Sequence, residues 1–289
     1  MITIETKRSK LKTPLRYPGG KSSLYRFLES VIKGHEWYNV EYIEPFAGGA
    51  GAAVSLLLLE KVRSIVVNDL DPAIYAFWYS VVNDNERFIR LVELTPVCIE
   101  EWEKQKAIYK ACDPSDLLAL GFATFFLNRT NRSGILNAGV IGGKQQLGKW
   151  KIDARYNKND LIEKAKLIGL YRDRITVLNK DGSDIINDYA NIENSFFYID
   201  PPYFDKGSFL YLNAFKPKDH DKLAEVLRNN RNAKWILSYD NARYIRDLYE
   251  GFNNQVFNLR YSAHHDSKSG SEIMIFSEAV DMGVVDSIC

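Results

Sequence analysis

Short apolar runs alternate with amphipathic stretches along most of this 289-residue chain. An apolar run of roughly four to eight residues between turn residues is typical of a buried strand, and apolar residues at helical spacing are typical of a helix. Seven runs predict strands, at Glu41–Glu44, Ser64–Asn68, Ile175–Leu178, Phe196–Ile199, Trp235–Ser238, Val256–Leu259 and Glu272–Phe276. Helical patterns accompany several of them, at Ser23–Lys33, Ala52–Lys61, Asp160–Tyr171, Asp219–Asn229 and Ala242–Tyr249. The largely alternating order predicts an α/β fold, and we expect the last two strands to pair antiparallel at one edge, because only a loop separates them.

The segment from about Ile74 to Asn159 differs, because it shows helical patterns and no strand. Two of these patterns are Cys98–Ala111 and Ser115–Asn128, and a glycine- and asparagine-rich stretch from Arg129 to Gly148 follows them. We interpret the segment as a helical insertion with a mobile basic loop. The predicted organisation is one domain made of residues 1–75 and 160–289, with a second domain, residues 76–159, inserted over the end of the sheet where ligands bind.

Composition limits the class of protein. The hydrophobic fraction of 46% and the charged fraction of 26% are those of a globular chain. The polar start, Met1–Lys12, is no secretory signal. The longest apolar run, Ala52–Leu59, is far shorter than the roughly 20 residues of a membrane span. Three scattered cysteines, Cys98, Cys112 and Cys289, have no zinc spacing and indicate a reducing, cytoplasmic location.

The net charge of +1 conceals an uneven distribution. Between Ala119 and Lys158 there are seven basic side chains and one acidic side chain, and between Met1 and Val40 there are eight basic and three acidic ones. Local positive fields of this kind suit the binding of phosphates. The alternative interpretation is two basic faces that are merely solvated.

A glycine-rich turn, Glu44-Pro45-Phe46-Ala47-Gly48-Gly49-Ala50-Gly51, follows the first predicted strand and opens a helix. Such a turn lets backbone amides approach an anionic ligand. Asp69 ends the next strand, 20 residues after Gly49, where an acid commonly binds ribose hydroxyls. These features predict a cofactor that contains adenosine. Val54 stands where a dinucleotide fingerprint has glycine or alanine, and Glu44 would repel a pyrophosphate but attract an ammonium group.

The tetrapeptide Asp200-Pro201-Pro202-Tyr203 follows the apolar strand Phe196–Ile199. The Asp200 carboxylate and the Pro201 carbonyl are two acceptors for the N–H bonds of a ring-attached amine. They would stabilise the positive charge that develops as the amine attacks a sulfonium methyl group. The prolines fix the backbone, and Tyr203 would stack on a base. The alternative interpretation is a tight turn with Tyr203 in the core.

Two other patterns are weaker. The string Pro18-Gly19-Gly20-Lys21-Ser22 fails as a phosphate loop, because Leu15 stands where that motif has its first glycine. We interpret it as a lid on the cofactor, with Tyr17 packing on it and Lys21 near its carboxylate. The run His264-His265-Asp266 suggests metal ligands, but no further ligand at suitable spacing is visible, so we expect no metal.

In this order the motifs resemble the Dam-like family of DNA adenine-N6 methyltransferases. The matching stretches are Arg16–Lys21, Tyr42–Gly51, Val67–Asp71 and Tyr198–Tyr203. Leu127–Gly134 is similar to the family's Asn-Arg signature in the target-recognition region. The resemblance extends from about residue 14 to residue 277. It implies a Rossmann-like seven-stranded methyltransferase sheet with an inserted, mainly helical target-recognition domain.

The resemblance also implies a methyl donor, S-adenosyl-L-methionine, and a partner, double-stranded DNA, from which the target adenine is flipped. The implied catalytic residues are Asp200, Pro201, Pro202 and Tyr203. The implied cofactor-binding residues are Tyr17, Gly19, Gly20, Lys21, Glu44, Pro45, Phe46, Gly48, Gly49, Gly51, Asp69, Asp181 and Asp200. The implied DNA-binding residues are Arg129, Asn131, Arg132, Ser133, Lys144 and Lys149. Asp181 would bond the cofactor's adenine amine, with Asp184 as the alternative.

After its Asn-Arg pair the chain departs from the members that act on GATC, which carry an aromatic and glycine pattern there, so the resemblance does not carry over a recognition sequence. A companion restriction endonuclease is a further partner we consider, and we expect a monomer or a weak dimer. Three rivals remain: methylation of RNA or of a protein amide, a non-catalytic binding module, and a nicotinamide oxidoreductase. The basic insertion argues against the amide substrate, the intact motifs argue against decay, and Val54 argues against the oxidoreductase.

Overall fold

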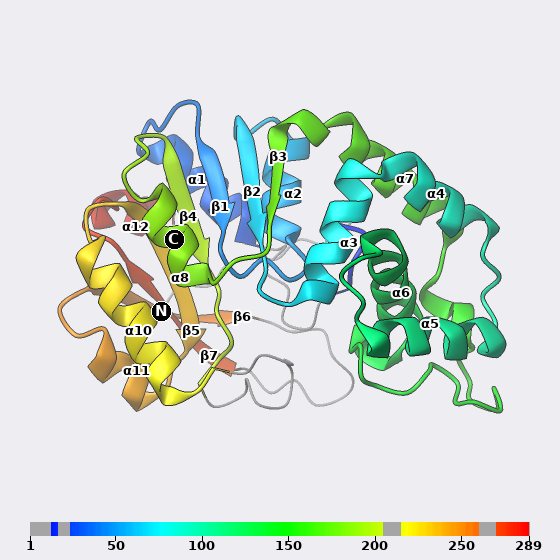
Figure 1. The fold of residues 1–289 in the computed structure, drawn as a ribbon. Coiled ribbons are helices and arrows are strands. Elements are labelled where there is room, and N and C mark those ends of the chain that lie inside the picture. Colours follow the sequence, from blue (N-terminus) through cyan, green and yellow to red (C-terminus); the bar gives the residue numbers. More distant parts are fainter. Residues whose placement is uncertain (1–12, 17–23, 205–214, 260–269, 289) are drawn as a thin grey trace.

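The structure is a computed structural model that describes residues 13–16, 24–204, 215–259 and 270–288. A seven-stranded sheet has the order β3-β2-β1-β4-β5-β7-β6 (Figure 1). Its strands are β1 (Glu41–Glu44), β2 (Ser64–Asn68), β3 (Ile175–Leu178), β4 (Ser195–Ile199), β5 (Lys234–Asp240), β6 (Asn253–Leu259) and β7 (Gly270–Phe276). All seven predicted strands are therefore confirmed.

The first five strands of this order are parallel, and β7 runs antiparallel to both β5 and β6. The expected antiparallel pair at one edge is thus confirmed. Strand β1 lies between β2 and β4. Strands β2 and β3 are therefore added on one side of β1, and β4 and the later strands on the other side. At such a reversal the loops that follow the neighbouring strands turn to opposite faces, which opens a crevice at the carboxyl ends of β1 and β4.

Alternation along the buried strands places the sheet between two helical layers. Tyr42 and Phe196 belong to the hydrophobic cluster on one face, while Ile43 and Phe197 belong to the cluster on the other. The first face is covered by α1 (Tyr25–Gly34) and α2 (Gly51–Leu58). The second is covered by α8 (Gly182–Tyr189), α10 (Pro217–Asn229) and α11 (Arg243–Leu248). The last helix, α12 (Met282–Ile288), packs against α1. The helix α8 was not predicted from the sequence.

The chain between β2 and β3 is helical, as predicted, and forms a lobe beyond the β3 edge (Figure 1). Its helices are α3 (Pro72–Asn83), α4 (Asn85–Leu94), α5 (Ile99–Ala111), α6 (Leu117–Thr130) and α7 (Lys158–Leu170). The predicted domain boundaries fall inside α3 and α7. Helix α3 contacts both β3 and α6, which makes it the wall shared by the two parts. Helix α6 is buried from Leu120 to Thr130, so it is the central element of the lobe.

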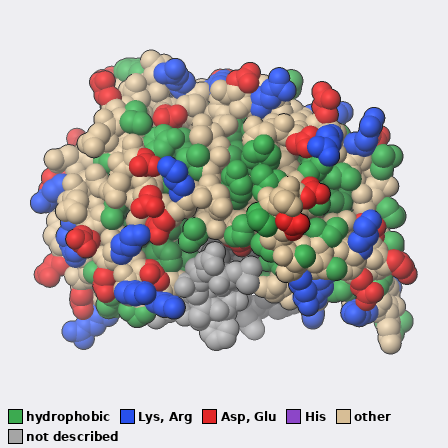
Figure 2. Space-filling model, viewed as in Figure 1, with side chains coloured by type: hydrophobic (Ala, Val, Ile, Leu, Met, Phe, Trp, Pro, Cys, Tyr) green, Lys and Arg blue, Asp and Glu red, His purple; other side chains and the backbone are tan. Residues whose placement is uncertain are grey.

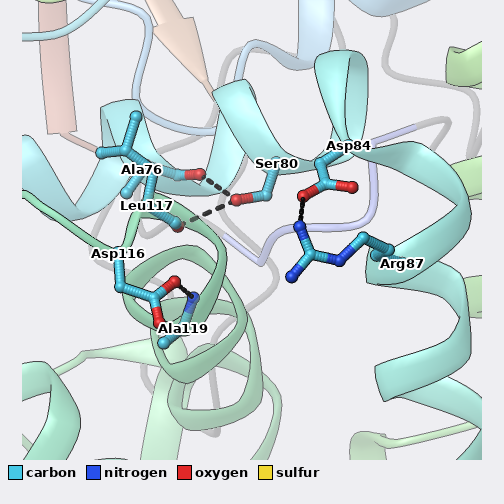
Figure 3. Close-up of polar contacts among 7 residues, drawn as sticks. All are labelled: Ala76, Ser80, Asp84, Arg87, Asp116, Leu117 and Ala119. Atoms are coloured by element: carbon cyan, nitrogen blue, oxygen red, sulfur yellow. Dashed lines mark hydrogen bonds and ion pairs between the residues drawn. The ribbon is translucent and has the colours of Figure 1, made fainter.

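Figure 3 shows how α3 and α6 are joined. The Ser80 hydroxyl lies 2.6 Å from the Ala76 carbonyl oxygen and 2.9 Å from that of Leu117, at the start of α6. Asp116 caps α6, because its carboxylate accepts a 2.9 Å hydrogen bond from the amide of Ala119. A Cβ atom at Gly121 would collide with the Ala76 carbonyl oxygen. The close approach of the two backbones therefore depends on glycine at this position.

In the described part of the chain, no helix is long and apolar enough to cross a membrane.

We predict that Gly121→Ala destabilises the fold. Alanine gains about 1 kcal/mol of helix propensity over glycine, but overpacking of a tight interface costs typically ~1–3 kcal/mol, and here the obstacle is backbone. The free energy of unfolding should therefore fall by about 1–2 kcal/mol in urea denaturation. A variant as stable as the wild type would show that α3 and α6 can separate without loss.

Candidate active site

The loops that follow β1, β2 and β3 are tied together by one buried side chain, Asn68. Its Nδ2 donates to the carbonyl oxygens of Pro45, at 2.8 Å, and of Lys180, at 2.9 Å. Its Oδ1 accepts a 2.9 Å hydrogen bond from the Lys180 amide. Losing any of these buried hydrogen bonds would be costly, because the partner group would remain buried without a hydrogen bond. Asn68 therefore fixes the rim of the crevice, a role that its place inside the Val67–Asp71 motif did not reveal.

The glycine turn is braced on its carbonyl side. Trp78 of α3 donates its indole Nε1–H to the Gly48 oxygen at 2.9 Å, and the Thr13 hydroxyl donates to the Gly49 oxygen at 2.7 Å. Gly48 and Ala50 have positive φ angles of 47° and 42°, which turn the chain sharply into α2. Among the described residues, the amides of Gly49 and Gly51 have no hydrogen-bond acceptor. The carbonyl groups of the turn are thus held in place, while its amide groups can donate hydrogen bonds to an anionic group.

Glu44 ends β1 and is only 6% exposed. Its Oε1 accepts hydrogen bonds from the amide of Ala53, at 2.9 Å, and from the hydroxyl of Tyr42, at 3.1 Å. Its Oε2 has no partner among the described residues. Burial raises the pKa of Glu44 to about 8, although both hydrogen bonds oppose the shift, and the Asp200 carboxylate adds to it. A buried carboxylate with an unused oxygen is suited to a cationic ligand.

Asp69 directly follows β2 and binds the same turn from the other side. Its Oδ2 accepts a 2.8 Å hydrogen bond from the Gly48 amide, and its Oδ1 accepts one of 2.9 Å from the Asp71 amide. Burial raises the pKa of Asp69 to about 7, against the effect of these two bonds. The predicted acid is therefore positioned beside the glycine turn.

Asp181 and Phe46 both lie at the start of α8. The Asp181 carboxylate caps α8 through the Ser183 amide, at 2.8 Å, and forms a 2.9 Å ion pair with Lys222. Burial opposes its ionisation, but these bonds outweigh burial and lower the pKa of Asp181. A Cβ atom at Gly182 would collide with the Phe46 ring, so the ring packs directly on the backbone that follows Asp181. Asp184 is exposed.

The loop Asp200–Tyr203 leaves the carboxyl end of β4, adjacent to β1. Ser238 of β5 donates a 2.7 Å hydrogen bond to Asp200 Oδ1. Tyr198 lies 2.8 Å from the same serine oxygen and must be the donor there, because the serine proton is already committed. This chain of hydrogen bonds orients the Asp200 carboxylate.

The far end of the loop is held by Asp240, also on β5, which accepts a 3.0 Å hydrogen bond from the Phe204 amide. Phe204 stacks on Tyr244 with ring centroids 4.6 Å apart. Tyr203 is half-buried, with its ring centroid 6.4 Å from that of Tyr239. Sequence reasoning missed Ser238 and Asp240. The sequence does contain a signal for them, because both are polar residues at the end of an otherwise apolar strand. The predicted strand ended at Ser238, whereas β5 extends to Asp240.

The predicted DNA-binding residues fall into two groups. Arg132, Ser133, Lys144 and Lys149 are exposed, and Lys144 forms a 2.9 Å ion pair with Glu103. Arg129 and Asn131 are buried.

Asn131 is structural in this state, which differs from the DNA contact we expected. Its Oδ1 accepts a 2.7 Å hydrogen bond from Trp102 Nε1, and its Nδ2 donates to the carbonyl oxygens of Ile135 and Leu136. The side-chain oxygen and both amide protons of Asn131 are engaged within the lobe, because position 131 is where α6 ends against α5 and the chain reverses. The side chain therefore shapes the loop that follows α6 and offers no atom to a base.

The expected mobile loop is a hydrogen-bonded turn. The Gln146 side chain donates to the carbonyl oxygens of Ile141 and Gly143 and accepts a 2.8 Å hydrogen bond from the Ile152 amide. The turn exposes two large apolar side chains that sequence reasoning did not select, Leu147 at 81% and Trp150 at 61%.

Lys149 accompanies the exposed tryptophan, with its Nζ 5.8 Å from the Trp150 ring centroid. Figure 2 shows both signs of charge interspersed over the face in view. The folded turn thus presents a basic side chain next to large exposed apolar ones.

The remaining predicted residues Tyr17, Gly19, Gly20 and Lys21 lie outside the described residues, as do His264, His265 and Asp266. In the described ranges, no group of three or more histidine, cysteine or acidic side chains could hold a metal ion.

Comparison with known proteins identifies the family to which the chain is similar. A model of the family described as D12 class N6 adenine-specific DNA methyltransferase matches residues 17–263, which include every predicted site residue. Among curated proteins, the chain is similar to one named Type II methyltransferase M.CviBI, from Paramecium bursaria Chlorella virus NC1A. The two are 23% identical over 279 residues, which cover 91% of this chain and 96% of that protein.

We predict that Glu44 makes stability fall as the pH rises. The folded chain holds the Glu44 proton up to a pH of about 8, whereas the group's ordinary pKa is 4.5. The stability that the protonated form provides is complete below pH 4.5 and is lost towards pH 8. Glu44→Gln should lack this loss and at pH 8 exceed the wild type by a few kcal/mol (of the order of 1.4 kcal/mol per pKa unit) in urea denaturation.

The control for this prediction is Glu41→Gln, the same change at the opposite end of β1, which should keep the fall seen in the wild type. Parallel pH profiles for the wild type and Glu44→Gln would contradict the assignment of a buried, protonated Glu44.

Proposed function

Because the chain belongs to the D12 class of N6 adenine-specific DNA methyltransferases, we propose that it transfers a methyl group from S-adenosyl-L-methionine to the N6 amine of adenine in double-stranded DNA. The observation that carries this proposal is the Asp200–Tyr203 loop beside the glycine turn, at the reversal of strand order. Its carboxylate is oriented by the Tyr198–Ser238 hydrogen bonds before any ligand arrives.

The residues around the glycine turn fit this cofactor. Glu44 offers a buried carboxylate oxygen to the ammonium of the methionine part, and Asp69 lies where a carboxylate meets ribose hydroxyls. Phe46 offers an aromatic face close to Gly182 for the adenine ring. When bound, S-adenosyl-L-methionine supplies an electrophilic methyl group.

The Asp200 loop acts on the amine. The Asp200 carboxylate and the Pro201 carbonyl accept its two N–H bonds, which draws the nitrogen lone pair out of the adenine ring and stabilises the developing positive charge. Pro201 and Pro202 fix the backbone that presents the carbonyl.

We further propose that the adenine is flipped out of the duplex to reach this loop. Unstacking costs about a few kcal/mol, and stacking on Tyr203, worth ~1–3 kcal/mol, offsets much of it. The half-buried position of Tyr203 supports this role, because the ring packs near Tyr239 while part of the residue stays accessible.

The exposed residues of the recognition lobe support a duplex partner. Arg132, Lys144 and Lys149 would neutralise phosphates, and Trp150 would contact sugars or bases where the turn enters a groove. The companion endonuclease and the monomeric or weakly dimeric state remain predictions; light scattering on the purified protein tests the second.

We predict that Asp200→Ala abolishes methyl transfer. Purified protein, labelled S-adenosyl-L-methionine and unmethylated DNA are incubated, and the DNA is digested to nucleosides. The wild type should place label in N6-methyldeoxyadenosine, while Asp200→Ala should lose at least about a hundredfold in rate, the scale for removing one transition-state acceptor. Cofactor affinity should stay within a few fold.

The control is Asp173→Ala, an acid whose side chain is 95% exposed, which should keep full activity. A wild type that labels RNA or protein but no DNA would retain the cofactor site and reject the DNA substrate. Near wild-type activity of Asp200→Ala would remove this residue from the mechanism.

We predict different roles for two adjacent residues of the turn. Lys149→Ala should weaken DNA binding and reduce the slope of log affinity against log salt by about 0.9, as expected for one lost phosphate contact. Trp150→Ala should weaken binding with an unchanged slope, because no charge is lost.

Fluorescence anisotropy at several salt concentrations measures both effects. Tyr38→Ala, which removes another exposed aromatic residue, is the control and should bind DNA as the wild type does. If Lys149→Ala and Trp150→Ala both bind DNA normally, the turn lies outside the DNA interface.

A further inference from the structure

Arg129 is a buried cation that forms no ion pair with any described residue. It lies in the last turn of α6 and is only 7% exposed. Its Nε donates no hydrogen bond, and in the described part of the chain its guanidinium forms no ion pair either. Burying an unpaired charge is strongly unfavourable in a folded protein. A stable fold that keeps one therefore suggests a ligand that is yet to bind.

The surroundings of Arg129 are cationic as well. Burial lowers the pKa of Arg129 to about 10, and repulsion from Arg16 contributes to this shift. Arg16 is half-buried, and burial together with repulsion from Arg155 lowers its pKa. Arg155 is exposed. Arg16 is thus coupled both to the buried Arg129 and to the exposed Arg155, whose 3-10 turn packs against α6. We name these three residues the arginine cluster.

The other polar groups nearby leave the cluster unneutralised. The hydroxyl of Tyr156 is buried and has no hydrogen-bond partner. Among the described residues, the acid that acts on Arg129 electrostatically is Asp160, and it is already paired with Lys164 at 2.8 Å. The cluster therefore combines excess positive charge with unused donors, which is the composition of an anion site.

The cluster is held together by Asn128. Its Oδ1 accepts a 2.7 Å hydrogen bond from the Arg16 amide, and its Nδ2 donates to the carbonyl oxygens of Arg16 and Gly134. The same N-terminal segment is attached to the glycine turn by the bond from Thr13 to Gly49. Arg16 is therefore fixed between the recognition lobe and the cofactor turn.

We propose that the arginine cluster, Arg16, Arg129 and Arg155, is a binding site for one backbone phosphate of the DNA substrate. The inference rests on the proposed function and deepens it, because it assigns Arg129 to a phosphate and adds two residues from different segments. A phosphate ester provides the anionic oxygens that planar guanidinium groups bind in pairs. Duplex DNA supplies such a group at fixed spacing, and it would enter past the exposed Arg155.

The arrangement gives this contact a consequence beyond affinity. A phosphate held by Arg129 and Arg16 joins α6 of the recognition lobe to the segment that is hydrogen-bonded to Gly49. Binding of DNA would thereby stabilise the glycine turn. Phosphate contacts commonly position a protein on the duplex in this way, without reading its sequence.

The first experiment uses Arg155→Gln, which removes the exposed member without disturbing the core. It should weaken DNA binding about tenfold and lower the salt slope by about 0.9, while affinity for S-adenosyl-L-methionine stays unchanged. Arg172→Gln is the matched control, because its side chain is 67% exposed and lies just before β3, at the amino end of the parallel strands and away from the crevice at their carboxyl ends. It should bind DNA as the wild type does.

The second experiment replaces single DNA phosphates by neutral methylphosphonates. One position should weaken the wild type about as much as Arg155→Gln does and should weaken that variant no further. Additive losses at every position would overturn the proposal, as would a wild-type salt slope in Arg155→Gln.

The third experiment separates a binding site from a structural role. Arg129→Met keeps the length of the side chain and removes the buried charge, so without DNA it should be at least as stable to heat as the wild type. DNA binding should nevertheless fall by at least tenfold. A clear loss of stability with unchanged DNA affinity would make Arg129 structural and overturn the proposal.

Two further outcomes are decisive. Stabilisation of the wild type by inorganic phosphate, lost in Arg155→Gln while DNA affinity is unchanged, would assign the cluster to a free anion and overturn the proposal. A wild type that binds and methylates no DNA would overturn the proposed function together with this site. Methylation of DNA by a protein with an inert cluster would overturn the site alone.

Discussion

The reversal of strand order between β1 and β4 is the constraint on which the rest of the molecule depends. It brings the end of β1, with Glu44 and the glycine turn, next to the end of β4, with Asp200. Neighbouring parallel strands keep their loops within a few ångströms, so two motifs more than 150 residues apart meet without any flexible linker. The Asn68 side chain then fixes the loops on the β2 and β3 side of the same crevice. The proposed methyl transfer depends on this strand order, because the two motifs can act together only when they lie side by side.

The crevice is built at some expense of stability. Glu44 and Asp69 have pKa values raised to about 8 and about 7, because burial disfavours their ionised forms. A protein selected only for stability would have apolar residues or amides there. The ionised form of such a carboxyl is unfavourable without ligand and would be stabilised by a bound cation or by a pair of hydroxyl donors. Relief of this burial cost would therefore contribute to the free energy of ligand binding.

The helical lobe between β2 and β3 likewise buries charge, but of the opposite sign. Its central helix, α6, is anchored to α3 through Gly121 and Ser80, and it carries Asn128 and Arg129 at its end. Asn128 holds the N-terminal segment, while Arg129 is buried and forms no ion pair with any described residue. Binding of an anion there would relieve a cost that the fold carries in its absence. The lobe and the sheet are thus connected through hydrogen bonds as well as through packing.

The sequence by itself determined the seven strands, the helical insertion and the position of each motif after its strand, because periodicity and turn residues are local signals. It did not determine which polar residues are buried. Asn131 and Arg129 stand in one basic run with Arg132, yet the end of α6 buries the first two and exposes the third.

Ser238 and Asp240 orient the Asp200 loop from a strand that lies almost 40 residues further along the chain. Tertiary structure alone decided these roles, since burial and hydrogen-bond partners depend on segments that meet only after the sheet and the lobe have packed together.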